Sequence, residues 1–219
     1  GHGQSSQTGA GHGPVPVARG GNLPLSFAQE RLWVLHEMDR GDVAYNIPAA
    51  LVLTGDLHLV ALKQALQEIV RRHETLRTTF DVHREEPVQK IGTEPILELP
   101  LEDLTHLSEH KLDEARRWAA RELEEPFDLR TGPVIRGRIL RLDANRHVLL
   151  LTVHHIVADG WSMEIIVTEL EQLYRMLISE ASLPPGELEL QYADYAVWQR
   201  KAARDGGLEP ELRYWTQQL

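Results

Sequence analysis

The stretch His147-Val148-Leu149-Leu150-Leu151-Thr152-Val153-His154-His155 decides the fold class of this chain. Its apolar run is almost continuous, which is typical of a central strand buried on both faces of a sheet. A short loop through Asp159-Gly160 follows, and then a helical pattern of apolar residues from about Ser162 to Ile178. We therefore expect a buried strand, a loop that begins with two histidines, and a helix in direct succession.

Helical and extended patterns alternate on the N-terminal side of this unit. Helices are predicted for Leu25–Met38, Leu59–His73 and Glu109–Glu124, and Ser26 is the predicted N-cap of the first. Strands are predicted for Ile47–Leu53, Leu76–Phe80, Val88–Ile91, Ile96–Leu101, Val134–Leu142 and His147–Val153. The strand Ile96–Leu101 is assigned to a sheet edge because Pro100 cannot donate a ladder hydrogen bond. This order predicts an α/β sandwich with a mixed, largely antiparallel sheet.

The composition excludes several classes of function. The chain has 219 residues and a net charge of −10, so bulk charge does not favour nucleic acid or an anionic membrane as a partner. It has no cysteine, which excludes a disulfide scaffold, a thiol nucleophile and a cysteine-ligated metal site. No apolar run reaches the roughly 18 residues of a membrane span, and the N-terminus lacks the apolar core of a signal peptide. The composition predicts a soluble, cytoplasmic domain.

Residues 1–22 differ in composition from the rest of the chain. They contain seven of the 16 glycines, and Arg19 is their one charged residue. This composition is typical of a flexible linker, and Gly1-His2 matches the remnant of a cleaved purification tag. We expect residues 1–22 to form a flexible lead and residues 23–219 to form the folded body.

The loop after the buried strand is the candidate site, because it carries the pattern HHxxxDG from His154 to Gly160. In a chain with 11 His and 16 Gly residues this pattern is expected by chance about 0.002 times. Adjacent residues of an extended chain point to opposite faces, so one histidine can face a substrate while the other braces the loop. Backbone N–H groups at the start of the following helix can point at a negative oxygen.

Three other interpretations of this loop compete with a catalytic one. Two buried histidines satisfied by backbone carbonyls would have no chemical role. A metal site is disfavoured because the two side chains point apart and no third histidine stands at helical spacing nearby. A serine hydrolase is disfavoured because the chain has no G-x-S-x-G elbow, and Ser162 is better explained as a helix N-cap.

The segment His154 to Ser162, HHIVADGWS, resembles the core motif of the condensation domains of nonribosomal peptide synthetases. Three further blocks resemble family motifs in the family's order: SFAQERLW (26–33), RHETLRTTF (72–80) and YADYAVWQ (192–199). With the stretch PFDL (126–129), the resemblance extends from about Leu23 to Leu219. It implies a chloramphenicol acetyltransferase-like fold, a two-layer sandwich that forms one lobe of a two-lobed domain.

The resemblance also implies roles for individual residues. His155 would face the reaction channel, while His154 and Asp159 would be structural parts of the catalytic motif. An arginine of the second block, Arg72 or Arg77, would hold Asp159 in an ion pair. The N–H of Gly160 would donate to the oxyanion of the tetrahedral intermediate. Trp161 and Ser162 would lie on the substrate-binding side of the motif, and no metal is implied.

The implied reaction is amide bond formation in the synthesis of antibiotics and other secondary metabolites. The amine of an acceptor aminoacyl group attacks the thioester of a donor acyl or peptidyl group. Phosphopantetheine arms of two carrier proteins deliver both substrates, so no cofactor is bound directly, and an adenylation domain is the expected neighbour. The intact histidine motif speaks against a heterocyclising domain, and the runs Arg31-Leu32-Trp33 and Gly160-Trp161-Ser162 favour an elongation domain with an L-configured donor.

Two alternatives remain beside this interpretation. One is a stand-alone acyltransferase of the same superfamily that uses a coenzyme A thioester. The other is a binding or docking lobe with no activity of its own. Leu208, Leu212, Trp215 and Leu219 follow a helical spacing up to the last residue, and nothing resembles the later family motifs. We therefore expect an N-terminal lobe that folds, is inactive without its C-terminal lobe, and self-associates through an exposed apolar patch.

Overall fold

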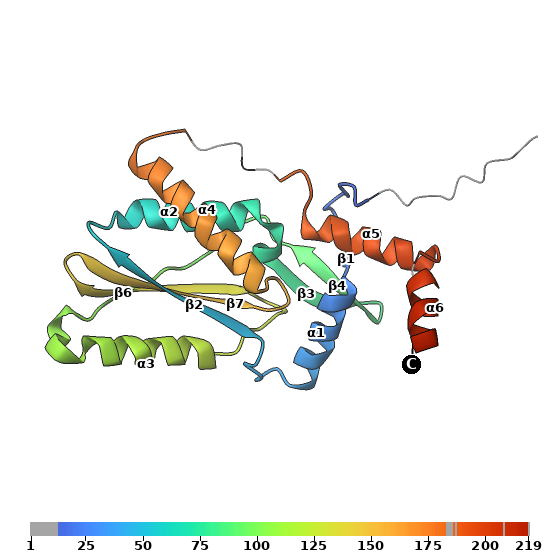
Figure 1. Ribbon diagram of the computed structural model, residues 1–219, viewed down its shortest axis with the longest axis horizontal. Coiled ribbons are helices and arrows are strands. Elements are labelled where there is room, and N and C mark those ends of the chain that lie inside the picture. The colour runs from blue at the N-terminus through green and yellow to red at the C-terminus, as the bar shows by residue number, and fades with distance from the viewer. Residues whose placement is uncertain (1–12, 183–185, 187, 208, 219) are drawn as a thin grey trace, which may run out of the picture.

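The computed structural model describes residues 13–182, 186, 188–207 and 209–218. Its helices are α1 (Phe27–Met38), α2 (Leu59–Arg72), α3 (Lys111–Glu124), α4 (Gly160–Ile178), α5 (Tyr192–Arg204) and α6 (Glu209–Gln218), with short 3-10 helices η1 (Glu74–Arg77) and η2 (Thr105–His110). Its strands are β1 (Leu23–Pro24), β2 (Asn46–Thr54), β3 (Thr78–His83), β4 (Glu86–Ile91), β5 (Leu101–Asp103), β6 (Ile135–Asp143) and β7 (Arg146–His154). Figure 1 shows their arrangement.

The larger sheet has the strand order β2-β7-β6-β5, so β7 lies inside the sheet as its apolar sequence predicted. Strand β7 is antiparallel to both neighbours. Its Leu150 lies opposite Ala50 of β2, and its Val153 lies opposite Ile135 of β6. The short strand β5 runs parallel to β6, which makes the sheet mixed. The α/β class and the largely antiparallel, mixed sheet are therefore confirmed.

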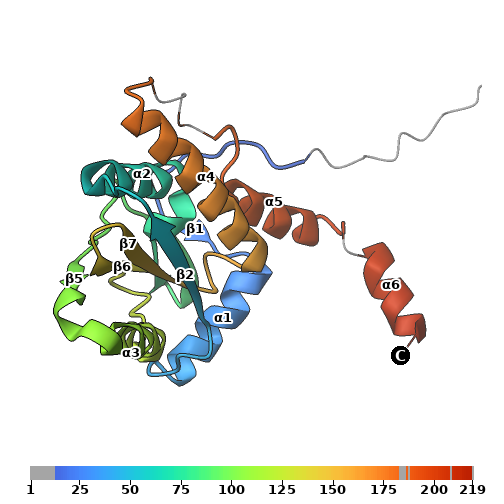
Figure 2. The same ribbon diagram turned by 60° about the vertical axis from the view of Figure 1, so that its left-hand side comes forward.

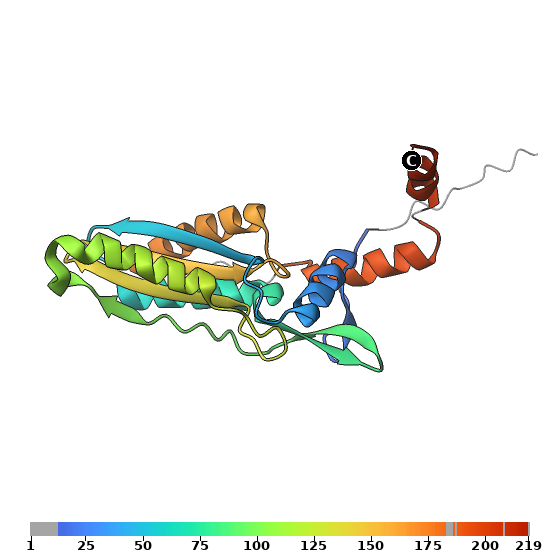
Figure 3. The same ribbon diagram turned by 90° about the horizontal axis from the view of Figure 1, so that it is seen from below.

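Helices cover both faces of this sheet. Leu149, Leu151 and Val153 of β7 pack in one core cluster with side chains of α2 and α4. Leu150, on the other face, belongs to a second cluster with Ala115 of α3. Figures 2 and 3 show α3 on one side of the sheet and α2 and α4 on the other. This sheet therefore has three layers, α3, the sheet, and α2 with α4, instead of the expected two. Successive side chains of a strand point to opposite faces, so a strand that is buried on both faces needs a helix on each side.

A second sheet, of order β1-β4-β3, lies beside the end of β7. Its core cluster contains Trp33 of α1, Phe80 of β3 and Ile156 of the loop after β7. Helix α1 begins after Ser26, whose hydroxyl accepts from Gln29 N in a capping box, so the predicted N-cap is confirmed. The first family block therefore packs, through Trp33, in the same core cluster as Ile156 of the candidate loop.

The predicted edge strand Ile96–Leu101 is wrong. Only Leu101–Asp103 forms a strand, and the residues before it make no ladder. Pro95 and Pro100 lack N–H groups, although the carbonyl of Pro100 accepts from Ile139 N at 2.8 Å. Leu97 and Leu99 are still buried, since the segment packs its apolar side chains without a regular ladder.

Part of the expected lead, residues 17–19, contacts the body. Val17 N and the Arg19 guanidinium both bond to Asp194 of α5, so residues 17–19 are held against the body.

Residues 1–12 lie outside the described residues. So do Leu208 and Leu219 of the predicted apolar stripe, while Trp215 of α6 is 59% exposed. Of the described helices, none combines the length and apolar character needed to cross a membrane.

Candidate active site

The candidate site is the loop between His154, the last residue of β7, and Gly160, the first residue of α4. Its first turn is closed by the bond from Val157 N to His154 O at 3.1 Å. The His155 N–H donates to Tyr45 O at 2.8 Å, so the turn that leads into β2 holds the loop from the side. The backbone around the two histidines is therefore fixed by hydrogen bonds on both sides.

His154 points into the protein. It is 2% exposed, and its Nδ1 accepts from Ile156 N at 3.1 Å. The edges of its ring contact His36 and Phe127, with ring centroids 6.1 and 5.9 Å apart. Burial lowers the pKa of His154 to about 4, and the neighbouring histidines add to the effect. A neutral imidazole with these contacts braces the loop and is not available to a substrate.

His155 points the other way, as the alternation of an extended chain predicted, and is exposed. Its Nδ1 lies 2.8 Å from Ala158 O. A carbonyl only accepts, so Nδ1 must carry the proton in this bond. In the neutral ring Nε2 then keeps its lone pair. In the neutral form of His155, the bond to the backbone carbonyl therefore selects the tautomer in which Nε2 can accept a hydrogen bond.

Asp159 is the N-cap of α4. Its Oδ1 accepts from Ser162 N at 2.8 Å and from the Ser162 hydroxyl at 2.6 Å, and these bonds lower the pKa of Asp159. The prediction that Ser162 is the N-cap is therefore wrong by three residues. Gly160 is exposed and is the first residue of α4. The N–H groups at the start of a helix have no partner within the helix. Trp161 beside it is 74% exposed.

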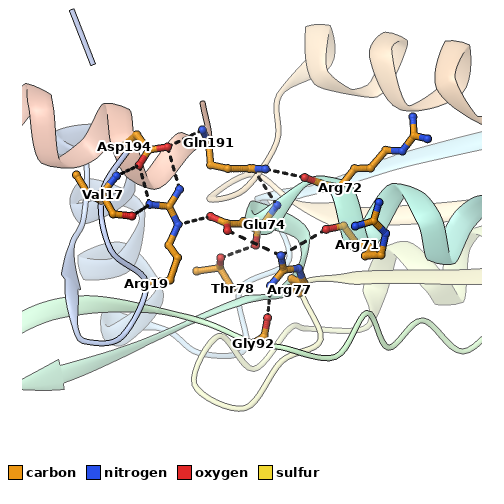
Figure 4. Close-up of polar contacts among 10 residues, drawn as sticks. All are labelled: Val17, Arg19, Arg71, Arg72, Glu74, Arg77, Thr78, Gly92, Gln191 and Asp194. Carbon is orange, nitrogen blue, oxygen red and sulfur yellow. Dashed lines mark hydrogen bonds and ion pairs between the residues drawn. The ribbon is translucent and has the colours of Figure 1, made fainter. Parts of the chain in front are cut away.

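The ion pair between Asp159 and a second-block arginine is not among the contacts of the described residues. Arg72 Nε bonds Glu68 Oε1 at 2.7 Å, and the Arg72 side chain points away from the polar contacts around Arg77 in Figure 4. Arg77 donates to Gly92 O and lies 3.9 Å from Glu74. The physical reason is local: the Asp159 carboxylate faces solvent and is used by the first turn of α4.

A pair of substitutions at Asp159 separates a helix cap from an ion pair. Asn is as good an N-cap as Asp, so Asp159→Asn should change the free energy of unfolding by less than about 0.5 kcal/mol. Asp159→Ala removes the acceptor and should cost about 1 kcal/mol. Urea unfolding at neutral pH measures both. Equal losses in the two variants would show that the charge of Asp159 contributes beyond the cap, as an ion pair with an arginine would require.

The other interpretations of the loop can be compared with this geometry. Within residues 13–182 and the shorter described ranges after them, no group of three or more His, Asp or Glu side chains could hold a metal ion. The Ser162 hydroxyl donates to Asp159 and has no bond to a histidine there, unlike the nucleophile of a serine hydrolase.

Three residues that contact the loop or the second family block were missed by the sequence analysis. Tyr45 supports His155 through its carbonyl, which any residue could supply, so no signal existed. Thr75 lies inside the second block, and its hydroxyl donates to Val157 O at 3.0 Å. Arg19 is the one charge in a Gly-rich lead, which was a signal that the linker interpretation did not use.

The fold and the site together define the class. A mixed sheet whose inner strand ends in an inward and an outward histidine, followed by a short loop and a helix, is consistent with the chloramphenicol acetyltransferase-like fold. Comparison with protein families narrows this class. The model of the condensation domain matches residues 20–219. The chain belongs to the condensation-domain family of nonribosomal peptide synthetases, as its four sequence blocks predicted.

Similar proteins and structures agree with this assignment. Chondramide synthase cmdD of Chondromyces crocatus and a linear gramicidin synthase of Brevibacillus parabrevis are each 45% identical over 94% of the chain, which covers 5% and 4% of their lengths. The starter condensation domain of rhizomide synthetase RzmA matches in fold with a TM-score of 0.82 at 22% identity, over 90% of this chain and 50% of that one. The first condensation domain of the calcium-dependent antibiotic synthetase has a TM-score of 0.79 at 25% identity, over 91% and 48%. The chain therefore spans about half of each solved domain.

Proposed function

We propose that this chain is the catalytic N-terminal lobe of a condensation domain that forms peptide bonds. The observation that carries the proposal is the bond from His155 Nδ1 to Ala158 O, which leaves Nε2 as an acceptor at the loop surface. The amine of an acceptor aminoacyl group would attack the carbonyl carbon of a donor thioester. The new C–N bond forms, the C–S bond breaks, and the proton lost by nitrogen ends on the thiol of the donor's phosphopantetheine arm.

His155 Nε2 is the group that would take the amine proton or hold the N–H in line for attack. An α-amine has a pKa of about 7.7–8.0, so part of it is neutral at cellular pH without help. Placement of the amine is therefore the larger contribution of His155, and proton transfer the smaller one. Gly160 at the exposed start of α4 is the proposed donor to the oxyanion, because an N–H there has no helical partner.

The partners and the location of the reaction follow from the same proposal. The donor and acceptor would arrive on carrier proteins in the cytoplasm, with an adenylation domain in the same synthetase. A C-terminal lobe would supply the other wall of the channel, which agrees with the chain covering 50% of the rhizomide starter domain. We propose that this lobe alone is inactive, since His155 is exposed to water here rather than enclosed.

The proposed donor is L-configured and carrier-bound. The support is the intact His154-His155 pair with the runs Arg31-Leu32-Trp33 and Gly160-Trp161-Ser162, which resemble elongation domains. Trp161 is 74% exposed beside Gly160, where it can contact an incoming acyl group. The proposal therefore predicts that the site uses an L-aminoacyl donor faster than the D-aminoacyl donor.

Reconstitution with loaded carriers tests the proposal. The synthetase module that contains this chain is mixed with an acceptor aminoacyl carrier and a donor supplied in three forms: L-aminoacyl carrier, D-aminoacyl carrier, or the same acyl group on coenzyme A. We expect dipeptide on the acceptor carrier with the L-form, less with the D-form, and none with coenzyme A. Equal use of the coenzyme A thioester would favour the stand-alone acyltransferase, and no product from any donor would favour a docking lobe. The 219-residue chain, tested in parallel, should give no dipeptide.

A further inference from the structure

Arg19, in the segment before the first strand, lies between two carboxylates that are distant in sequence. Its guanidinium donates to both oxygens of Asp194, at 2.6 and 2.8 Å, and its Nε donates to Glu74 at 2.7 Å (Figure 4). Two parallel N–H···O bonds to one carboxylate form the strongest and most directional pairing available to an arginine. The segment is therefore held at a defined place on the lobe.

Asp194 depends on this contact because it is 1% exposed. Burial raises the pKa of Asp194. The bonds from Arg19 and from the N–H groups of Gln191 and Val17 lower the pKa by more than burial raises it, so the carboxyl is ionised. Without the guanidinium, one buried carboxylate would lose its counter-charge and would face Glu74. Breaking a buried pair by removing one partner is costly, since it leaves an uncompensated charge.

The same contacts reach the second family block. The Gln191 side chain accepts from Glu74 N at 3.1 Å and donates to Arg72 O at 2.7 Å. Arg19, Asp194, Gln191 and Glu74 thus form one polar unit, which we call the clamp. It joins the lead segment, the start of α5 and the turn η1 (Figure 4). A displacement of Arg19 would act first on the position of Glu74.

The clamp is one residue away from a contact with the candidate active site. Thr75, which follows Glu74 in η1, donates its hydroxyl to Val157 O at 3.0 Å. Val157 precedes Ala158, whose carbonyl accepts from His155 Nδ1. A continuous path of bonds and peptide groups therefore runs from Arg19 to the carbonyl that sets the tautomer of His155.

We propose that Arg19 is a positioning residue: residues 17–19 form a strap bound by the clamp, and the clamp holds the loop that orients His155 through Glu74 and Thr75. The catalytic consequence of this positioning rests on the proposed function, in which His155 Nε2 accepts a hydrogen bond from the substrate amine. The clamp and its effect on the ring can be measured without any substrate. The folded unit that supports the site therefore begins at or before Val17, ahead of residue 20 where the family match starts.

Nuclear magnetic resonance of the full 219-residue chain tests the proposal with matched variants. Arg19→Ala removes the anchor, and Thr75→Val removes the hydroxyl with little change of shape. Thr105→Val is the control, because the hydroxyl of this exposed threonine of η2 donates to Asp103 Oδ1 at 2.6 Å, a bond that involves neither the clamp nor the loop. The readouts are amide hydrogen exchange at Val17 and Gln191, and the ring ¹⁵N shifts of His155, which report its tautomer.

Each variant has a distinct expected result. In Arg19→Ala, exchange at Val17 and Gln191 should rise on the order of a hundredfold, and the His155 ring should become a mixture of tautomers. Thr75→Val should alter the ring and leave Val17 protected, and Thr75→Ser should restore the ring signals. Thr105→Val should leave both readouts unchanged. If Arg19→Ala does not fold, Arg19→Lys, which keeps the charge without the two-pronged bond, should show the same changes at smaller size.

Two results would overturn the proposal. Unchanged protection of Val17 in the Arg19 variants would show that Arg19 does not anchor the strap. Loss of that protection with an unchanged His155 ring would show that the clamp does not position the loop. Neither result depends on catalysis, so failure of the proposed reaction in the carrier assay would be recognised separately.

Discussion

Replacing His155 with alanine should lower the rate of peptide transfer between loaded carriers by about 100- to 10,000-fold, the range expected for a group that positions and deprotonates a nucleophile. The physical reason is the loss of Nε2, the ring nitrogen that the Ala158 carbonyl leaves unprotonated. His155 is exposed, so the substitution should not change the free energy of unfolding by more than about 0.5 kcal/mol. Single-turnover transfer by the intact module measures the rate.

The matched control is His106→Ala. His106 is an exposed histidine in η2, next to α3 on the far side of the sheet from α2 and α4, and this variant should transfer at the wild-type rate. A His155→Ala module that also keeps the wild-type rate would remove the assignment of His155 to the chemistry. In that case binding of the carriers and enclosure of the substrates would have to supply the whole acceleration.

The second large effect is expected on stability as the pH falls. The pKa of His154 is about 4 in the folded chain, against 6.5 for a free histidine, so the unfolded chain binds the proton first. Stability from this group is complete above pH 6.5 and is lost as the pH falls toward 4. The difference of about 2.5 pH units corresponds to roughly 3 kcal/mol of unfolding free energy. Burial also lowers the pKa of His36, so its contribution has the same sign.

His154→Asn isolates this contribution. The asparagine oxygen can accept from Ile156 N in place of Nδ1, and the side chain does not titrate. Urea unfolding from pH 7 to pH 4 should give a profile flatter by about 3 kcal/mol than that of the wild type. A second measurement does not need the variant to fold: the His154 ring of the wild-type chain should stay neutral at pH 5. Parallel stability profiles, or a His154 that titrates near 6.5, would contradict the buried neutral role.

Local patterns predicted most of the body because they depend on neighbouring residues. The apolar run of β7 placed that strand inside the sheet, where it pairs with β2 and β6. Where two local solutions compete, the sequence was less informative. Asp159 and Ser162 are both good N-caps, and the structure uses Asp159. The segment Ile96–Leu101 has an extended pattern, but Pro100 within it and Pro95 before it lack the N–H groups that a regular ladder needs.

The candidate site was predictable to the same extent. The opposite orientations of His154 and His155 follow from the geometry of an extended chain and are confirmed. The pairing of Asp159 with Arg72 or Arg77 was taken from the resemblance, and the described contacts of Asp159 go to Ser162 instead. Arg19 and Asp194 are 175 residues apart, and no periodicity or spacing connects such distant residues.

The central claim is that the neutral His155 ring carries its proton on Nδ1, bonded to Ala158 O, and offers Nε2 as an acceptor before α4. The most direct measurement is a two-bond ¹H–¹⁵N correlation spectrum of the His155 ring near pH 8, with His155→Ala used to assign the signals. We expect the neutral form of the ring to carry its proton on Nδ1. A proton on Nε2 would contradict the claim, because that nitrogen could then neither accept nor align the proton of an attacking amine.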